Sequence, residues 1–346
     1  MGVVSVKAFD VAAASEADLH GYYEVSVESH AVDLPNEPRM SFDEFVGKLK
    51  NPPTGVGALE HWLVRRDGLV VAAVTVAFPE EENAHIALTT VTVHPRLRRQ
   101  GIGTSALRAL LPELMGRGRG VVEAWQLLKG GAGERWALEI GFQPAKSMEL
   151  QALVFAQTDS ARWKAKAPAG YRLERWVGAA PDHLVSSYAA AHAAMDDAPI
   201  GDSDFKSVQW SAARVREIEA DLRSREIERR VVVAVHEQTG EVVGLTEIEL
   251  YPNRPAVAMQ GDTAVVADHR GHGIGLWIKA HMVCWLIEER PVLQRVHTGT
   301  HTENTHMLKV NEQLGFETLR SVVAVNRPAA ELTACLADRR ATDFRA

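Results

Sequence analysis

The chain has 346 residues, of which 46% are hydrophobic and 24% are charged, and its formal net charge at pH 7 is −7. This balance is typical of folded soluble proteins and excludes a disordered chain, while the length suits two domains of ordinary size. The acidic balance argues against a nucleic-acid partner, and no apolar run is long enough to cross a bilayer, so no membrane partner is expected either.

The cysteine content and the N-terminal segment indicate the cellular compartment in which the protein is expected. The two cysteines, Cys284 and Cys335, lie far apart in sequence, which argues against a disulfide framework and against a zinc ribbon. The histidines show no metal-ligand spacing, so no metal is expected. Residues 1–14 lack a basic segment followed by an apolar core, and we therefore expect a cytoplasmic protein.

The first half of the chain alternates strand-like and helix-like segments. Ser15, followed by acidic residues, and Ser41, with Glu44 three residues on, predict two helix starts. Asp67-Gly68 predicts a hairpin turn, and Pro112 predicts a kink or an early end in the helix that starts at residue 102. The expected strands are 3–8, 62–66, 69–78, 86–93, 121–125 and 147–155, and a short helix is expected at 134–139.

After a polar connector at 158–170 the pattern starts again. Strands are expected at 171–175, 230–235, 242–250, 257–266 and 294–298. Helices are expected at 182–194 and 206–225, separated by 195–199, and then from residue 274 and over 304–314, where Gly315 serves as a C-cap.

Two glycine loops stand at corresponding places in this repeat. Arg98-x-x-Gly101-x-Gly103 and Arg270-x-x-Gly273-x-Gly275 each follow a β-branched run and open an apolar helix pattern. A helix start offers unpaired backbone N–H groups and a partial positive charge, and glycine lets an anion approach the backbone closely. The spacing matches neither the dinucleotide fingerprint nor the nucleotide P-loop. The loops therefore predict two sites for phosphate groups.

These loops resemble those of the GNAT acyltransferase superfamily, in which Gln/Arg-x-x-Gly-x-Gly/Ala holds the pyrophosphate of acetyl-CoA and the preceding strand contacts the pantetheine arm. The alternative is that the strands are merely buried. The resemblance implies acetyl-CoA as the acyl donor. The cofactor contacts that it implies are Val91, Val93, Arg98, Arg99, Gln100, Gly101, Ile102, Gly103, Thr104, Val265, Val266, Arg270, Gly271, His272, Gly273, Ile274 and Gly275.

A second mark of this superfamily is a helix of the form Asn-x-x-Ala-x-x-apolar-Tyr-x-x-Leu-Gly-Phe. The second half keeps Asn304, Gly315 and Phe316 but has Asn311 in place of the Tyr, and the first half has lost both the Asn and the Tyr. The resemblance implies cofactor contacts for Asn304 and Asn311. Since that Tyr often protonates the departing thiolate, the general acid is left unassigned.

The spacing of the two halves indicates a tandem duplication. Gly273 follows Gly101 by 172 positions, and Gly315 follows Gly141 by 174. In overall plan the chain resembles tandem proteins of the mycothiol synthase type. We therefore expect an α/β fold of two GNAT-like domains, 1–157 and 171–346, joined by the linker 158–170. The resemblance implies that each is a mixed, mostly antiparallel sheet flanked by helices.

Few residues suggest themselves as catalytic groups. A base must take the proton of the attacking amine. Asp262 lies near the expected bulge of the central strand, Glu247 lies on the neighbouring strand, and His301 follows a later strand. Asp196 and Asp197 fall where this superfamily binds its acceptor and could hold a cationic amine. The alternatives are a strand-end carboxylate for Asp262, a solvated loop histidine for His301, and helix-end capping for Asp196 and Asp197.

These features together predict an N-acetyltransferase that uses acetyl-CoA and a primary amine of a small molecule, by direct transfer in a ternary complex. The second half is the expected catalytic half because it keeps the fuller helix motif. Two alternatives stay open: the first half is the active one, or the protein is an acyl-CoA-binding scaffold or sensor without catalysis. The acceptor, the acyl chain length, the number of bound CoA molecules and the oligomeric state are not predicted.

Overall fold

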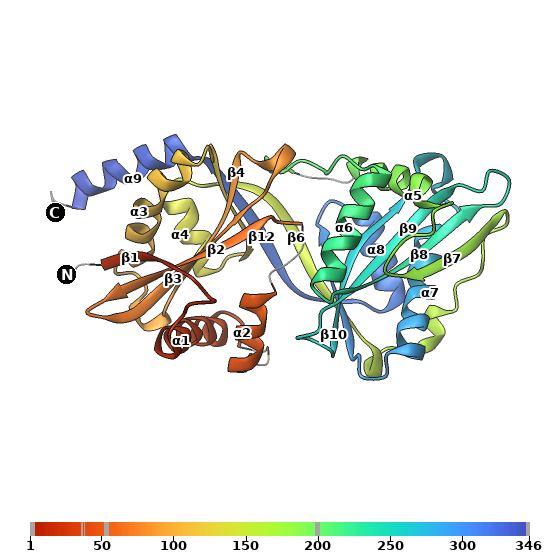
Figure 1. The fold of residues 1–346 in the computed structure, drawn as a ribbon, viewed down its shortest axis with the longest axis horizontal. Coiled ribbons are helices and arrows are strands. Elements are labelled where there is room, and N and C mark those ends of the chain that lie inside the picture. Colours follow the sequence, from red (N-terminus) through yellow and green to blue (C-terminus); the bar gives the residue numbers. More distant parts are fainter. Residues whose placement is uncertain (1–3, 36, 38, 52–54, 198–200, 344–346) are drawn as a thin grey trace. The chain divides into compact units, whose positions relative to one another are not determined.

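The computed structural model describes residues 4–343 except 36, 38, 52–54 and 198–200 (Figure 1). The chain divides into two compact units, each described here by itself. Unit 1 comprises Met1–Ser147, Gly201–Lys206 and Val322–Ala346, and unit 2 comprises Met148–Ile200 and Ser207–Ser321. Each unit therefore contains segments from both halves of the sequence.

The helix starts and the hairpin predicted for the first half are present. Ser15 accepts a hydrogen bond from the Asp18 amide, and Ser41 and Glu44 form a capping box. The hairpin turns through Asp67 and Gly68, both with positive φ, as a two-residue turn requires. The elements are β1 (Val4–Phe9), α1 (Glu16–Asp33), α2 (Phe42–Lys50), β2 (Ala58–Arg66), β3 (Leu69–Phe78), β4 (Ile86–Val93), α3 (Ile102–Gly116), β5 (Val121–Leu128), α4 (Ala132–Glu139) and β6 (Gln143–Val154).

The second half repeats this order of elements. Gly315 ends a helix with φ of 93°, as the C-cap prediction requires. The elements are β7 (Tyr171–Val177), α5 (Val185–His192), α6 (Ala212–Ser224), β8 (Glu228–His236), β9 (Val242–Leu250), β10 (Val257–Val265), α7 (Ile274–Glu289), β11 (Arg295–His301), α8 (Thr305–Leu314), β12 (Glu317–Pro328) and α9 (Ala329–Asp343). Short 3-10 turns include η4 (Ser160–Trp163) in the connector and η5 (Ala193–Asp197) after α5.

Two expectations about helix boundaries are wrong. Of the two alternatives predicted at Pro112, a kink or an early end, the early end is wrong: helix α3 runs on to Gly116, since the buried leucines on either side stabilise the helix by more than one lost backbone hydrogen bond costs. The helix expected over 206–225 begins only at Ala212, where Ser211 caps it by accepting from the Arg214 amide. Of the expected break at 195–199, residues 195–197 lie in η5, and 198 and 199 lie outside the described residues. Strand β12 and helix α9 were not predicted.

The sheet of unit 1 has the order β1-β2-β3-β4-β5-β12, with β4 and β5 parallel and the other pairs antiparallel. In unit 2 the order is β6-β11-β10-β9-β8-β7, with only β10 and β11 parallel among the described strands. The prediction of two mixed, mostly antiparallel sheets is confirmed.

The closing strands of the two repeats are exchanged. β6, which ends the first repeat, pairs with β11 from Met148↔His301 to Val154↔Arg295. β12, which ends the second repeat, pairs with β5 from Val322↔Leu128 to Pro328↔Val121. Each unit therefore completes its sheet with a strand that sequence order assigns to the other repeat.

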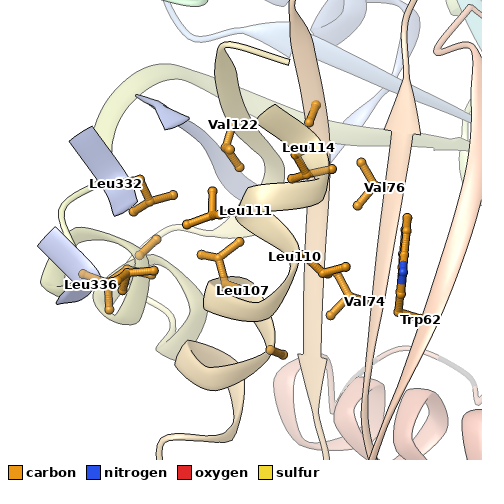
Figure 2. Close-up of a cluster of buried hydrophobic side chains, with 14 of the residues drawn as sticks. Trp62, Val74, Val76, Leu107, Leu110, Leu111, Leu114, Val122, Leu332 and Leu336 are labelled. Carbon is orange, nitrogen blue, oxygen red and sulfur yellow. The ribbon is translucent and has the colours of Figure 1, made fainter. Parts of the chain in front are cut away.

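Helix α3 packs against one face of the unit 1 sheet and also contacts α9. Figure 2 shows Leu107 and Leu111 of α3 near Leu332 and Leu336 of α9, while Leu110 faces Val74 of the sheet. All of these side chains are buried, and each buried leucine stabilises the fold by roughly 1.5–3 kcal/mol. In unit 2, α7 covers one face of the sheet and α5 the other, with separate apolar clusters. No described helix combines the length and apolarity of a membrane-spanning helix.

Candidate functional site

Each glycine loop follows a central strand and begins a helix. In unit 1, Gly101 has φ of 73° and precedes α3, and in unit 2, Gly273 has φ of 78° and precedes α7. The residues two positions earlier, Arg99 and Gly271, have φ of 63° and 82°. The two loops thus share a left-handed backbone at matching positions, a conformation that glycine adopts at little cost.

The first amides of these two helices are not capped by side chains. Helices α1, α2 and α6, by contrast, begin after serines that accept from an amide of the first turn. Uncapped amides at a helix N-terminus, together with the helix dipole, favour an anion. Both loops therefore offer backbone donors of the kind that a phosphate group needs.

The arginines of the two loops are held by the protein itself. Arg98 donates to both carboxylate oxygens of Asp33 at 2.6 Å, and Arg270 donates to Asp197 at 2.7 Å. Each also donates its Nε–H to the carbonyl of the last residue of its central strand, at 3.2 and 2.9 Å. Their guanidinium groups therefore fix the loops in place, which leaves the uncapped backbone amides as donors for the predicted phosphate.

Both central strands part from their parallel neighbours. Within the described residues, β4 pairs with β5 over Ile86–Leu88, and β10 pairs with β11 over Val257–Met259. Among the residues that the structure describes, none pairs on that side with the later residues of the central strands, which include Val91, Val93 and Val265. Val266 follows β10, and its amide donates to the Val243 carbonyl. Each unit therefore has a strand edge that opens toward its glycine loop.

The central strand of unit 2 carries a bulge that β4 lacks. The β9–β10 register shifts between Gln260 and Thr263, whereas β3 and β4 pair without a shift. At the bulge Gly261 lies against Glu247, where an added Cβ would come within 3.3 Å of the Glu247 Cβ. A bulge re-aims the side chain beside it, and here Asp262 is directed toward α5.

His192, the last residue of α5, lies between two of the predicted carboxylates. Its Nε2 is 3.1 Å from Glu247 Oε1, and its Nδ1 is 3.4 Å from Asp262 Oδ2. The ring is fully buried and stacks on Trp210 with 3.7 Å between centroids. Each ring nitrogen is therefore within ion-pair distance of one carboxylate. The structure thus brings Asp262 and Glu247 together through an unpredicted histidine.

The charges in this cluster stabilise one another. Burial acts to lower the pKa of His192, but Asp262 and Glu247 outweigh it and raise that pKa to about 9. Burial acts to raise the pKa of Glu247, yet Arg229 and His192 bring it down to about 2. At neutral pH the imidazolium and the Glu247 carboxylate are therefore both charged. The side chain of Asp262 is 38% exposed and that of Glu247 only 5%, so Asp262 is the member that a bound molecule can reach.

Buried side chains hold Glu247 in place. The Tyr188 hydroxyl, one turn before His192 in α5, donates to the Glu247 carboxylate. Arg229 of β8 lies 4.0 Å from Glu247 and donates to Glu249 at 2.8 Å. Burial is the main cause of the raised pKa of Tyr188, which keeps its proton. We name the group Asp262, His192, Glu247, Tyr188 and Arg229 the α5 cluster.

The corresponding place in unit 1 holds hydroxyl groups. The Tyr22 hydroxyl of α1 lies 2.9 Å from the Thr75 hydroxyl, as Tyr188 contacts Glu247 in unit 2. Thr75 of β3 pairs with Thr90 of β4. With the offset of 172 positions between the loops, these two residues correspond to Glu247 and Asp262 at the unit 2 bulge. Tyr22 also lies 3.2 Å from Nδ1 of His61, whose pKa is lowered by burial, so that ring is uncharged at neutral pH. Threonines thus replace both Glu247 and Asp262.

A segment from the second half of the sequence is anchored in unit 1. The Asn83 side chain, which is buried, donates to the Lys206 carbonyl at 2.9 Å and accepts from the Lys206 amide at 2.7 Å. Ser203 donates to the carboxylate of Glu123 at 2.6 Å, and the Asn326 side chain donates to the Asp202 carbonyl at 2.9 Å. Residues 202–206 are therefore bound by hydrogen bonds from several elements of unit 1.

This segment covers the point where β4 and β5 part. Glu123 pairs with Leu88 in the last residue pair that joins the two strands. Phe205 packs in one cluster with Leu88 and lies edge-on to Trp125, with 5.1 Å between ring centroids. Leu88 also pairs with Ala77 of β3, two residues from Thr75 and therefore on the same face of the sheet. The face of unit 1 that corresponds to the α5 cluster is thus partly covered by Phe205.

The remaining predicted site residues have other partners. His301 ends β11, and its Nδ1 accepts from the Glu303 amide at 3.2 Å. Asn304 caps α8 by accepting from the Met307 amide, and Asn311 is fully buried, donating to Gln151 at 2.9 Å and to Thr300 at 3.1 Å. Among the described residues, no contact joins these three to the α5 cluster. Asp196 lies exposed in η5.

The side chains of the loop residues also contact protein. Ile102 and Ile274 are buried in the two cores. Three more have polar contacts: Gln100 accepts from Arg66, Thr104 accepts from the Trp136 indole, and His272 Nδ1 lies 3.2 Å from the His269 carbonyl. The described residues contain no cluster of acidic, histidine or cysteine side chains that could hold a metal ion.

The sequence interpretation missed His192, Tyr188 and Arg229. Tyr188 and His192 are four residues apart and therefore share one helix face, and this spacing is the signal that could have drawn attention to them. Nothing in the sequence indicates that this face meets Glu247, because that contact depends on how α5 packs on the sheet.

Comparison with known proteins gives a consistent result for both halves. The model of the acetyltransferase (GNAT) family matches residues 21–129 and 195–316, which together make up more than half of the chain. The comparison with curated protein sequences gives no match.

Solved structures with the same fold extend over nearly the whole chain. A tandem GNAT protein from the clavulanic acid biosynthesis pathway, solved without acetyl-CoA, is 24% identical, with a TM-score of 0.72 over 94% of this chain and 99% of that one. A GCN5-related N-acetyltransferase from Sphaerobacter thermophilus is 17% identical, with a TM-score of 0.70 over 94% and 96%. At these identities the likeness concerns the fold.

Proposed function

The chain belongs to the GNAT acetyltransferase family, and from this premise we propose that unit 2 transfers an acetyl group from acetyl-CoA to a primary amine of a small molecule. The family makes the protein an acyltransferase. The acceptor class, the catalytic half and the roles of the residues belong to the proposal. The observation that carries it is the α5 cluster, which places an exposed carboxylate at the bulge of the central strand.

The backbone of unit 2 suits acetyl-CoA. The uncapped start of α7 and the left-handed Gly271 and Gly273 would receive the diphosphate, as anions bind at helix N-termini. The pantetheine arm would lie along the free edge of β10 beyond Met259, where its amides could bond to strand backbone groups. A backbone N–H of the bulge would donate to the thioester oxygen and stabilise the oxyanion that develops during attack.

Asp262 serves as the base in this proposal. It is the exposed carboxylate of the cluster, and it would take a proton from the ammonium form of the acceptor so that the nitrogen gains a free electron pair. The protonated His192 behind it keeps Asp262 oriented toward the acceptor. Glu247, with a pKa of about 2 and little exposure, is assigned to holding His192 and not to proton transfer.

The acceptor would approach on the α5 face. Asp262 and the exposed Asp196 both carry negative charge there, which favours a cationic amine. Asp197 is already paired with Arg270, so we assign it to fixing the loop and Asp196 to attracting the acceptor.

Unit 1 does not have the same chemical groups. Threonines stand at the places of Glu247 and Asp262, and the corresponding face is partly covered by Phe205. Its glycine loop keeps the backbone conformation needed for an anion. We therefore assign transfer to unit 2 and, at most, CoA binding to unit 1.

Two measurements test the proposal in sequence. Calorimetric titration with acetyl-CoA establishes binding, and release of free thiol is then followed with a panel of primary amines. We expect saturable binding and amine-dependent thiol release, with the acetyl group found on the amine by mass spectrometry. Binding without release for any amine would favour the scaffold or sensor alternative, and absence of binding would contradict the proposal altogether.

A further inference from the structure

Lys279 is a buried lysine that the proposed transfer has not yet used. It lies in α7 and is only 3% exposed. Its ammonium group donates to Gln260 Oε1 at 3.0 Å and lies 5.3 Å from the centroid of the Phe316 ring. A buried cation is unfavourable unless it is paired, so this position carries a free-energy cost in the folded protein.

Burial lowers the pKa of Lys279 to about 7, and it is the only cause of the shift. No carboxylate among the described residues contributes to that pKa. The group therefore changes its charge near neutral pH, which is unusual for a lysine and suits proton transfer.

Gln260 ties Lys279 to the point where the strands of unit 2 part. Met259 and His297 form the last residue pair of β10 and β11, and Gln260 is the next residue along β10. The side-chain nitrogen of Gln260 donates to the Glu247 backbone carbonyl at 2.6 Å, and its side-chain oxygen accepts from Lys279. Gln260 also begins the bulge that ends in Asp262.

Lys279 and Asp262 lie on opposite faces of this sheet. Lys279 belongs to α7 and Asp262 contacts α5, and these helices pack in separate apolar clusters on the two faces. A thioester in the gap between β10 and β11 would therefore have a carboxylate on its acceptor side and an ammonium group on the other side.

We propose that Lys279 is the proton donor to the thiolate of departing CoA. The inference rests on the proposed function of unit 2. Asp262 first passes one proton of the acceptor ammonium to solvent. The neutral amine nitrogen then bonds to the carbonyl carbon and gives a second proton to Asp262, which releases it to solvent after the cycle. The carbon–sulfur bond then breaks, its electron pair moves to sulfur, and the sulfur takes a proton from the Lys279 ammonium. Lys279 regains a proton from solvent before the next cycle.

The relative acidities favour this transfer. A thiol has a pKa of about 8.5, so an ammonium group with a pKa of about 7 is the stronger acid and gives its proton to the thiolate. Asn311, at the position where the resembled superfamily often has a tyrosine donor, carries a neutral amide that is bonded to Gln151 and Thr300. Leu107 holds the corresponding position in α3, so unit 1 lacks this donor too.

The test compares Lys279→Met and Lys279→Leu with the control Lys309→Met, which removes an exposed lysine of α8. Leucine is the residue that unit 1 has at this position, so at least one of the two variants is expected to fold. The first readout is the pKa of the thiol of CoA bound to each protein, followed by thiolate absorbance. The second readout is kcat and KM for acetyl-CoA, measured separately in the thiol-release assay.

We expect the pKa of the bound thiol, taken from the thiolate absorbance below pH 7 where Lys279 still carries its charge, to be lower in the wild type and Lys309→Met than in the Lys279 variants by about one unit, because a nearby ammonium stabilises the thiolate. The Lys279 variants should lose about 100-fold in kcat with little change in KM for acetyl-CoA. An unchanged thiol pKa and kcat would overturn the role of Lys279 while leaving the proposed function intact. Acetylation of Lys279 itself would also overturn it. A wild type that binds no CoA would overturn both proposals.

Discussion

The two units keep the same glycine loop but differ in the side chains around the central strand. In unit 1, Thr75, Thr90 and Leu107 stand where unit 2 has Glu247, Asp262 and Lys279. The loops match because they act through backbone conformation, and a backbone site tolerates side-chain divergence. The proposed chemistry depends on particular side chains, and of these two sets only the one in unit 2 has a carboxylate and an ammonium group. Binding and catalysis can therefore be separated between the two copies.

The strand itself also differs between the units. Only β10, of the two central strands, carries the bulge that directs a carboxylate to the α5 face, and only unit 1 has residues 202–206 bound across the corresponding region. Unit 2 thus has an exposed carboxylate at its bulge, whereas residues 202–206 partly cover the corresponding region of unit 1.

The largest effect is expected from Asp262→Asn. Removing the base while keeping the shape should lower kcat by about 10²- to 10⁴-fold, because the acceptor amine then keeps its proton. Thr90→Val, at the matching place in unit 1, should leave kcat unchanged. The two variants are compared by thiol release at saturating acetyl-CoA. Equal losses in both would contradict the assignment of catalysis to unit 2.

Next in size is the loss of stability from Glu247→Gln. It leaves the buried cations His192 and Arg229 without their shared carboxylate, which should cost about 3–5 kcal/mol of unfolding free energy. Thr75→Ala in unit 1 removes only neutral hydrogen bonds, to Tyr22 and His61, and should cost about 1–2 kcal/mol. Denaturant unfolding followed by fluorescence measures both, and similar costs would show that the α5 cluster is no more tightly coupled than its counterpart.

The pH dependence of stability should also separate the units. The folded-state pKa of His192 is raised to about 9, so its ion pairs stabilise the protein fully below about pH 6.5 and lose their effect as pH rises through 9. The contribution is on the order of 3 kcal/mol. Glu247 contributes in the opposite range: its stabilisation is present above about pH 4.5 and is lost as pH falls toward 2.

The check is the difference in unfolding free energy between the wild type and His192→Gln from pH 6 to pH 10. It should shrink across this range. His61→Gln in unit 1, where burial keeps the imidazole uncharged, should give a difference that is constant above about pH 7.5 and changes only below it, where the imidazole of the unfolded chain gains a proton. A constant difference for His192→Gln would mean that this ring is not charged in the folded protein.

The smallest effect is expected at the segment bound to unit 1. Asn83→Ala removes two hydrogen bonds to Lys206 and should cost about 1–3 kcal/mol of unfolding free energy, because the backbone groups of Lys206 lose their partner. Asn83→Asp keeps the acceptor and should cost less. Neither change should alter kcat. If Asn83→Ala raised amine-dependent thiol release, the cover on unit 1 would be hiding a second active centre.

Sequence patterns were sufficient to predict those features that depend only on residues close together in the sequence. The hairpin at Asp67-Gly68, the cap at Ser41 and the loops at Gly101 and Gly273 follow from local rules and are present. The bulge beside Asp262 was also placed correctly, on the resemblance of the central strand.

The features that were missed depend on contacts between distant residues. His192 meets Glu247 and Asp262 only because α5 packs across the sheet, and no periodicity encodes that contact. Lys206, where a helix was predicted to begin, is instead bound in unit 1 by Asn83, and nearby Ser203 donates to Glu123. The exchange of β6 and β12 is likewise set by which strand edge each meets.

The central claim, that acetyl transfer takes place in unit 2, is tested most directly by Gly101→Val and Gly273→Val in the same thiol-release assay. Valine is strained at either position because both have φ above 70°, and an added Cβ meets no neighbouring atom within 4 Å in either loop, so the two changes are matched. We predict that Gly273→Val abolishes amine-dependent release while Gly101→Val keeps it. Loss of turnover in Gly101→Val, with turnover retained in Gly273→Val, would contradict the account.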